Sequence, residues 1–343
     1  MVELSRRFRE YRPSSYRPAA RASAAGPPGV PAPRRPGLAT LPGRVDASRN
    51  FRRTGGRHGR IDRDPATLAG RSNYFRATYA QGSKTAPVAA QRVLHHERLR
   101  EAARALYGRT VIDPYVVFAN LLIPGQELGI HTDIPVFRGV NHQTVPSWLR
   151  VVMLHSGLFD DQRIPIATVV LHFGEARGGE FVFYPDGPGG PVATHVPSHN
   201  SGVMIDADSI FHGVDRVHGD DTGMRQLRSH MRLVHDDGDG WSLRDSHRSV
   251  ARFASGDVRF SVSWKARCFV DQSEQAAASE AQSDLSLEAV VERLTVDLRT
   301  RDRLPGGADG LSELELAHLL IDEFVPFPPP TLSRPESTAT ASS

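Results

Sequence analysis

The chain has 343 residues, of which 39% are hydrophobic, which suits a globular domain with polar tails and excludes a fibrous or wholly disordered protein. The formal net charge is only +3, and the arginine bias of its basic residues reflects composition rather than a binding code. A single cysteine, Cys268, excludes an intramolecular disulfide, and no apolar run approaches the ~18 residues of a membrane span, so we expect a cytoplasmic protein without membrane contact.

Residues 1–65 are rich in Arg, Pro, Ala, Gly and Ser and contain few large apolar side chains. Such a segment buries too little apolar surface to offset its chain entropy, so we predict a disordered tail. Its basic residues include Arg34, Arg35, Arg52, Arg53 and Arg57. We expect them to be solvated, and a nucleic-acid partner is not expected. The Pro-rich residues 326–343 form a second predicted tail.

Apolar residues at helical spacing predict a helix over 86–108 that ends at Gly108. β-like runs separated by turn signals follow at 115–123, 127–133, 166–173, 180–184, 192–196, 202–206, 209–217, 227–235 and 258–268. Asp237-Gly238-Asp239-Gly240 predicts a hairpin. Residues 146–159 predict a helix inserted between strands, and 285–298 and 312–324 predict two amphipathic helices.

This density of strands predicts a mainly β fold with flanking helices, built on a double-stranded β-helix, a jelly roll of the cupin kind. We place this domain at residues 66–275, with the helix and the hairpin as insertions. The C-terminal helices occupy residues 276–325.

His131-Thr132-Asp133 is the most informative motif in the chain. Because side chains alternate across a β-strand, His131 and Asp133 point the same way if this segment is extended. His212, on a distant predicted strand, would complete two histidines and one carboxylate on one face of a metal ion. That set leaves about three coordination positions open, as in non-haem Fe(II) oxygenases.

The other histidines lie in no comparable paired motif, and we expect them to be structural or exposed: His142, His155, His172, His195, His199 and His218. A ligating imidazole usually donates its second N–H to an acceptor. For His212, the sequence offers Asp206, Asp208 and Asp215 and does not choose among them.

The motifs around these residues resemble those of the Fe(II)/2-oxoglutarate-dependent dioxygenase superfamily over roughly residues 110–270. The strand, turn and metal strand at 120–133 are similar to that family's, as are Gly178-Gly179-Glu180 and the strand at 202–206 that leads into His212-Gly213-Val214. The resemblance implies that His131, Asp133 and His212 bind Fe(II), with 2-oxoglutarate and O₂ as co-substrates.

Arg259-Phe260-Ser261 resembles the family's Arg-x-Ser anchor for the far carboxylate of 2-oxoglutarate, which a planar guanidinium suits. Asn120 resembles a position that often hydrogen-bonds the co-substrate. Arg259 lies 47 positions after His212, whereas ten-odd is usual; Arg225 and Arg228 fit that spacing but lack the apolar continuation of a core strand. We therefore prefer Arg259 and predict an inserted hairpin and loop over 219–256.

The expected activity is hydroxylation of an unactivated C–H bond of a small molecule, with release of succinate and CO₂. Halogenating relatives carry a small residue where this chain has Asp133, so halogenation is not expected. Two alternatives stay open. One is a cupin-like hydrolase or isomerase with Zn²⁺ or Mn²⁺ and no 2-oxoglutarate, and the other is a non-catalytic binding module with a basic tail. The sequence identifies no substrate.

Overall fold

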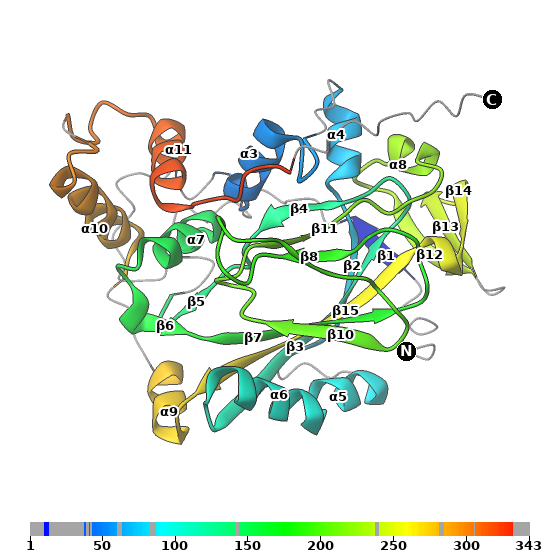
Figure 1. Cartoon of the computed structure of the whole chain (residues 1–343), viewed down its shortest axis with the longest axis horizontal. Coiled ribbons are helices and arrows are strands. Elements are labelled where there is room, and N and C mark those ends of the chain that lie inside the picture. Colours follow the sequence, from blue (N-terminus) through cyan, green and yellow to red (C-terminus); the bar gives the residue numbers. More distant parts are fainter. Residues whose placement is uncertain are drawn as a thin grey trace, which may run out of the picture.

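Two antiparallel sheets face one another at the centre of the chain (Figure 1). This computed structural model describes residues 10–13, 38, 41, 43–59, 64–82, 87–140, 144–236, 240–280, 285–304 and 306–331. Among these residues the larger sheet has nine strands, in the order β10-β7-β15-β3-β2-β1-β12-β13-β14, and the smaller has four, in the order β4-β11-β8-β9. The mainly β, jelly-roll fold that the strand pattern predicts is confirmed.

The strands of the large sheet are β10 (Ser201–Ile205), β7 (Ile166–Phe173), β15 (Arg259–Phe269), β3 (Val111–Leu122), β2 (Phe75–Gln81), β1 (Glu10–Pro13), β12 (Arg232–Asp236), β13 (Gly240–Asp245) and β14 (Arg248–Ala254). Those of the small sheet are β4 (Leu128–His131), β11 (His212–Val214), β8 (Phe181–Phe183) and β9 (Ala193–His195). A ribbon of β5 (Val136–Phe137) and β6 (Arg163–Ile164) lies at one end.

Helices cover the outer faces of both sheets (Figure 1). The large sheet carries α5 (Val88–Leu94), α6 (Glu97–Tyr107) and α9 (Gln272–Glu280). The small sheet packs its apolar face against α3 (Val45–Thr54), α7 (Ser147–Ser156), α10 (Leu287–Thr300) and α11 (Glu313–Phe324). Within the described ranges, no helix is both long and apolar enough to cross a bilayer.

The alternation of β15 divides polar from apolar side chains. Val262 and Trp264 face α5 and α6, and the Trp264 indole donates to the Leu94 carbonyl at 2.8 Å. That carbonyl ends α5, so the helix predicted over 86–108 is two helices separated at His95 and His96. Ser261 and Ser263 face the small sheet, so β15 contributes polar side chains to the space between the sheets.

The N-terminal segment departs from the disorder expected over residues 1–65. β1 pairs with β2 and β12, and α3 packs on β4. Val45, Ala47 and Phe51 are buried on one face of α3, an amphipathic stretch too short to raise the average hydrophobicity of the segment. Arg57 also makes a bidentate ion pair with Asp215 instead of being solvated. Residues 1–9, 14–37 and 332–343 of the predicted tails, with Arg34 and Arg35, lie outside the described residues.

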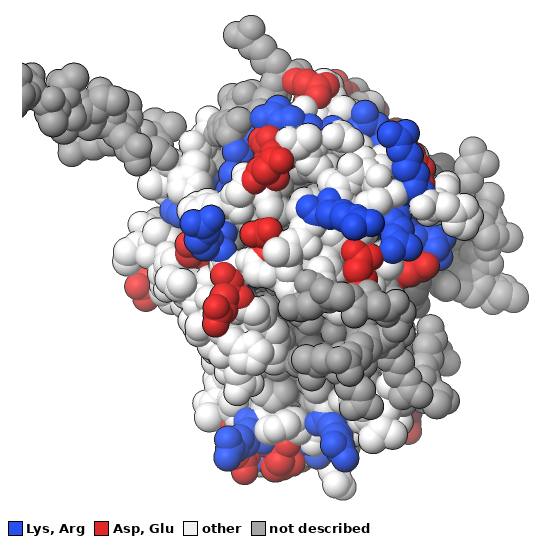
Figure 2. Space-filling view, turned by 90° about the vertical axis from the view of Figure 1, so that its right-hand side faces the viewer, with Lys and Arg blue, Asp and Glu red and all other residues white. Residues whose placement is uncertain are grey.

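The segment between His212 and Arg259 adds structure to one end of the large sheet. It contains α8 (Thr222–Gln226) and the antiparallel strands β12, β13 and β14, while α4 (Pro65–Arg71) packs on α8. Asp236 pairs with Gly240 as a hairpin requires, although the turn at 237–239 lies outside the described residues. On this end of the molecule, acidic and basic side chains are interspersed (Figure 2).

Candidate metal and co-substrate site

The two histidines and the aspartate meet at the inner edge of the small sheet. His131 ends β4, His212 begins β11, and the two are paired across the strands. Asp133 is held by a hydrogen bond from its amide to the Ala207 carbonyl at 2.8 Å. Its Oδ1 lies 3.8 Å from His131 Nε2 and 3.9 Å from His212 Nε2, and the donor atoms of all three side chains lie within 4.8 Å of one another.

This donor set fits a metal ion. Two ligands at about 2.1 Å from one ion lie at most about 4.2 Å apart, so both Asp133–His distances are compatible with a shared ion. The Nδ1 atoms of His131 and His212 donate to the carbonyls of Gly129 and Ile210, each at 2.8 Å, which leaves both Nε2 lone pairs directed at the centre. Burial lowers the pKa of His131 to about 3 and also lowers that of His212, so both imidazoles are neutral at pH 7, the form in which histidine binds a metal ion.

The prediction that an aspartate accepts the second N–H of His212 is therefore wrong. The partner is the Ile210 backbone carbonyl, two residues away, and not an aspartate. Asp206 pairs with Arg163, and Asp215 pairs with Arg57. A backbone acceptor leaves no side-chain signature, so residue types alone cannot reveal it.

Lys265 is a part of the site that the sequence interpretation missed. Its Nζ donates to Asp133 Oδ2 at 2.6 Å, which leaves Oδ1 facing the two histidines. Burial disfavours the Asp133 carboxylate, but Lys265 and the two histidines together hold its pKa below the usual value. The sequence pattern could have identified Lys265, because this residue continues the inward-facing alternation of Arg259, Ser261 and Ser263 along β15.

Replacing Lys265 by methionine is expected to lower the free energy of unfolding of the metal-free protein by about 3 kcal/mol, because it leaves a buried carboxylate without its cation. A divalent ion compensates the same carboxylate, so the variant should bind metal more tightly than the wild type. Denaturant unfolding with and without metal measures both effects. Arg267→Met is the control. Arg267 lies on β15, as Lys265 does, and its half-exposed ion pair is with Asp113 on β3, so its loss should lower the free energy of unfolding by less than about 1 kcal/mol. Equal effects of the two substitutions would contradict this role of Lys265.

Asp208 lies beside this cluster and is fully buried. Within the described part of the chain, neither of its carboxylate oxygens has a hydrogen-bond partner. Burial raises its pKa to about 8, and the Lys265 charge opposes that rise. Because its folded-state pKa lies above the unfolded value near 4, Asp208 costs no stability below pH 4 and progressively more as pH rises to 8.

Asp208→Asn is therefore expected to stabilise the metal-free protein at pH 7, by about 2 kcal/mol once the unpaired amide of the new side chain is allowed for. The gain should grow from pH 4 to pH 8. Thermal unfolding across this range, with Asp206→Asn as the control that removes a paired carboxylate, measures it. If the gain in stability did not change with pH, the Asp208 carboxylate would already be ionised in the folded protein without a cost in folding free energy.

Arg259 lies across the pocket from His131, Asp133 and His212. Its guanidinium is buried and donates to the Gly179 carbonyl at 2.6 Å and to Ser261 Oγ at 3.1 Å. Gly179 allows this approach, because a Cβ there would lie 2.6 Å from Arg259 Cδ. Burial lowers the pKa of Arg259 to about 10, so it stays cationic at pH 7. No carboxylate in the described ranges pairs with it, which leaves its charge for a ligand.

His172 adjoins Arg259, although the sequence interpretation treated it as structural or exposed. It is buried, its Nδ1 lies 3.4 Å from Arg259 Nη2, and it pairs with Ser261 across β7 and β15. Its Nε2 has no hydrogen-bond partner in the described part of the structure. Burial and the neighbouring Arg259 lower its pKa to about 3, so it is neutral. The β7 register that brings it to Arg259 is not visible in the sequence.

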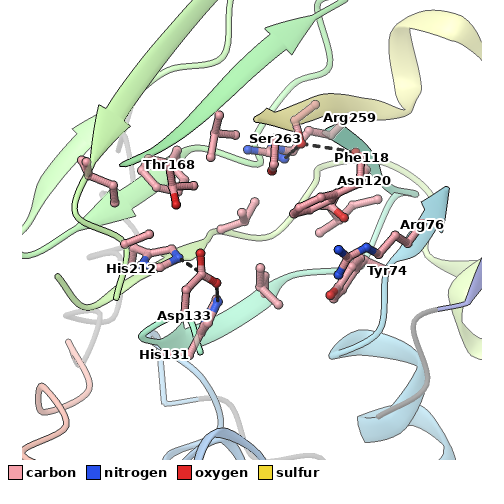
Figure 3. Close-up of a pocket in the computed structure, with 18 residues that line it drawn as sticks. Tyr74, Arg76, Phe118, Asn120, His131, Asp133, Thr168, His212, Arg259 and Ser263 are labelled. Carbon is pink, nitrogen blue, oxygen red and sulfur yellow. Dashed lines mark hydrogen bonds and ion pairs between the residues drawn. The ribbon is translucent and has the colours of Figure 1, made fainter. Parts of the chain in front are cut away.

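One pocket is lined by both groups (Figure 3). The predicted site residues that line it are His131, Asp133, His212, Arg259, Ser261 and Asn120. Arg225 and Arg228 are exposed and lie outside it; Arg225 pairs with Asp221. Tyr74, Arg76 and Phe118 form a wall that the sequence interpretation did not assign.

The other histidines of the described ranges do not line the pocket. His155 stacks on Phe211, with its Nε2 3.3 Å from Thr132 Oγ1. His195 lies beside His172, with ring centroids 5.2 Å apart, and His199 is exposed next to Phe173. His142 lies outside the described residues.

No protein-family model matches the sequence, and no curated protein matches it. Solved structures of 2OG-Fe(II) oxygenases are similar to it. A 2OG-Fe(II) oxygenase-family oxidoreductase from Burkholderia pseudomallei is 14% identical over 57% of this chain and 66% of its own, with a TM-score of 0.32. A Pseudomonas putida prolyl-4-hydroxylase is 13% identical over 57% and 70% (TM-score 0.30). HygX from Streptomyces hygroscopicus, with nickel, 2-oxoglutarate and hygromycin B bound, is 9% identical over 57% and 70% (TM-score 0.31).

The chain thus spans just under two thirds of the length of the first of these proteins. At 9–14% identity, a residue's role does not transfer from them to this chain.

Proposed function

We propose that this protein is an Fe(II)- and 2-oxoglutarate-dependent oxygenase that hydroxylates a C–H bond of a small molecule. The observation that carries this proposal is the placement of two neutral histidines and a carboxylate on one face of a pocket, opposite a buried arginine without a carboxylate partner in the described part of the chain. The first group suits a divalent ion, and the second suits the far end of a dicarboxylate.

His131, Asp133 and His212 would hold the iron on one face, and the rest of its coordination sphere would open into the pocket. Bound iron, with 2-oxoglutarate and O₂, supplies the oxidation that yields succinate, CO₂ and a hydroxylated product. The backbone carbonyls of Gly129 and Ile210 fix both imidazole rings, so the ligands need no rearrangement. Lys265 orients Asp133 so that a single oxygen faces the centre.

Arg259 and Ser261 would bind the far carboxylate of 2-oxoglutarate. The planar guanidinium is already fixed by the Gly179 carbonyl and by Ser261 Oγ, so little rotamer freedom is lost on binding. His172 adds a buried Nε2 beside this guanidinium. Asn120 lies opposite Ser261 on β3 and lines the pocket, where the N–H groups of its side-chain amide would donate to the co-substrate.

The pocket supports a small-molecule substrate. Its walls between the metal ligands and Arg259 are apolar, with Leu122, Val170, Phe181 and Val214 among them. Such walls exclude water from the reacting centre and strengthen the electrostatic interactions inside it.

Calorimetric titration tests the assignment. Metal-stripped protein should bind one equivalent of Fe(II) under anaerobic conditions and then one of 2-oxoglutarate, with far weaker 2-oxoglutarate binding when metal is absent. The cupin-like alternative predicts metal binding with no metal-dependent binding of 2-oxoglutarate. Protein that binds neither ligand would contradict the proposal.

A further inference from the structure

A second arginine lines the pocket, and neither the metal nor the co-substrate accounts for it. Arg76, on β2, is exposed at the pocket wall, and its guanidinium carbon lies 3.7 Å from the centroid of the Phe118 ring. No ion pair or hydrogen bond from the described part of the chain engages its guanidinium. Its register partners are Asn120 on β3 and Arg12 on β1, and neither is acidic.

The stacking on Phe118 fixes Arg76 in a ligand-binding position. An arginine over an aromatic face is held by a cation–π interaction and by the flat contact of the two planes. The N–H groups at the edge of the guanidinium stay free, and these are the groups that bind a carboxylate in a bidentate manner. In the close-up, Arg76 and Tyr74 lie on the far side of the pocket from the three metal ligands (Figure 3).

Arg76 is a separate anion-binding point from Arg259. Ser261, Asn120 and Arg76 lie in one row across β15, β3 and β2. Two strand spacings place the backbone of Arg76 roughly 10 Å from that of Ser261. The Arg259 guanidinium donates to Ser261 Oγ, whereas the Arg76 guanidinium lies over the Phe118 ring, so we assign the two arginines to different anions.

The charges of the pocket lining leave Arg76 uncompensated. Among its described lining residues, Arg76 and Arg259 are the cations and Asp133 is the carboxylate. Asp133 is paired with Lys265 and directed at the metal position. A bound 2-oxoglutarate would place its two carboxylates at the metal and at Arg259, so an anionic group at Arg76 would have to come from another ligand.

The surroundings of Arg76 define the rest of that ligand. Tyr74 and Phe118 flank it, and Leu128, at the start of β4, lines the same pocket. An aromatic or branched apolar body would cover these side chains and gain the usual free energy of apolar burial. A neutral polar molecule would leave the guanidinium without its partner.

On this basis, and resting on the proposed oxygenase function, we propose that Arg76 forms the substrate subsite and binds the carboxylate of a small carboxylic acid with an apolar body. The acid would lie with its carboxylate at the Arg76–Phe118 wall and its apolar body directed towards the metal face. Arg76 is thus a determinant of substrate specificity that acts independently of co-substrate binding.

The test uses two matched pairs of probes, phenylacetate with phenylacetamide and 3-methylbutanoate with its amide, so that each pair differs only in charge. Their dissociation constants are measured by calorimetry on full-length protein loaded with Ni²⁺, to prevent turnover, and 2-oxoglutarate. The variants are Arg76→Gln and Arg76→Lys. Arg12→Gln is the matched control, because it removes an exposed arginine from the adjacent register position outside the pocket.

We expect wild-type protein and Arg12→Gln to bind the acid of at least one pair about tenfold or more tightly than its amide, the effect of one charge-assisted hydrogen-bonded pair. Arg76→Gln should reduce that preference to twofold or less, and Arg76→Lys should retain part of it, while 2-oxoglutarate affinity changes less than twofold in both. Equal binding of acid and amide by the wild type, or no binding of any probe, would overturn the proposal. So would a loss of 2-oxoglutarate affinity in Arg76→Gln as large as that in Arg259→Gln. Failure of the wild type to bind 2-oxoglutarate would instead overturn the proposed function, because that measurement does not involve the probes.

Discussion

Replacing His131 by alanine is expected to lower iron affinity by more than about a hundredfold and to abolish 2-oxoglutarate turnover. Loss of a residue that merely orients a metal ligand costs about 10–100-fold in metal affinity, and His131 would be a ligand itself. The variant also leaves Asp133 with one histidine, which a divalent ion on an open face cannot bind tightly. Equilibrium dialysis against Fe(II), read by metal analysis, measures the change.

His247→Ala is the control for this substitution, because His247 is exposed on the inserted β-hairpin and does not line the pocket. It should match the wild type in both metal content and turnover. A His131→Ala protein that keeps wild-type metal affinity would show that His131, Asp133 and His212 are not the ligand set. The folded state of the variant is checked separately by its thermal unfolding.

The second large effect is expected at Arg259. Arg259→Gln should raise the dissociation constant of 2-oxoglutarate by about a hundredfold, because removal of one partner of a buried charge pair typically costs 2–5 kcal/mol. Fe(II) affinity should change less than twofold, since Arg259 lies across the pocket from the metal ligands. Arg259→Lys should restore only part of the affinity, because lysine lacks the planar fork. Calorimetry on metal-loaded protein measures these constants.

Arg225→Gln and Arg228→Gln test the alternative anchors that fit the usual spacing after His212. Both side chains are exposed and outside the pocket, so neither substitution should affect 2-oxoglutarate binding. If either of them weakened binding as Arg259→Gln is expected to, the assignment of the anchor would be wrong. Intact Fe(II) binding in Arg259→Gln would show that its loss of affinity is not caused by misfolding.

The sequence predicted the features that depend on local pattern. A β-like run between turn signals identified β7 over its whole length, and the helical spacing of 146–159 and 312–324 identified α7 and α11. The motif His131-Thr132-Asp133 was expected to lie on one extended strand, whereas β4 ends at His131 and Asp133 lies beyond it, held by its hydrogen bond to the Ala207 carbonyl. The long insertion before Arg259 was also predictable, because an apolar alternation resumes at residue 258 and a hairpin signal precedes it.

Features that depend on register across strands were not predictable. Arg76 lines the pocket because β2 pairs with β3, and His172 reaches Arg259 because β7 pairs with β15. Each of these residues alone resembles an ordinary strand residue. Lys265 differs, because it lies on the same strand and face as Arg259, and extending the alternation by two more residues would have found it. α3 was missed because three buried residues, Val45, Ala47 and Phe51, lie within a segment that is polar on average.

The most direct test of the central claim is the fate of 2-oxoglutarate. Purified protein is incubated with Fe(II), O₂ and 2-oxoglutarate without added substrate, and succinate is quantified over time. The account predicts slow succinate release that requires iron and is lost in His131→Ala and in Arg259→Gln but not in His247→Ala. Iron-loaded wild-type protein that releases no succinate, or a His131→Ala variant that releases as much as the wild type, would contradict it.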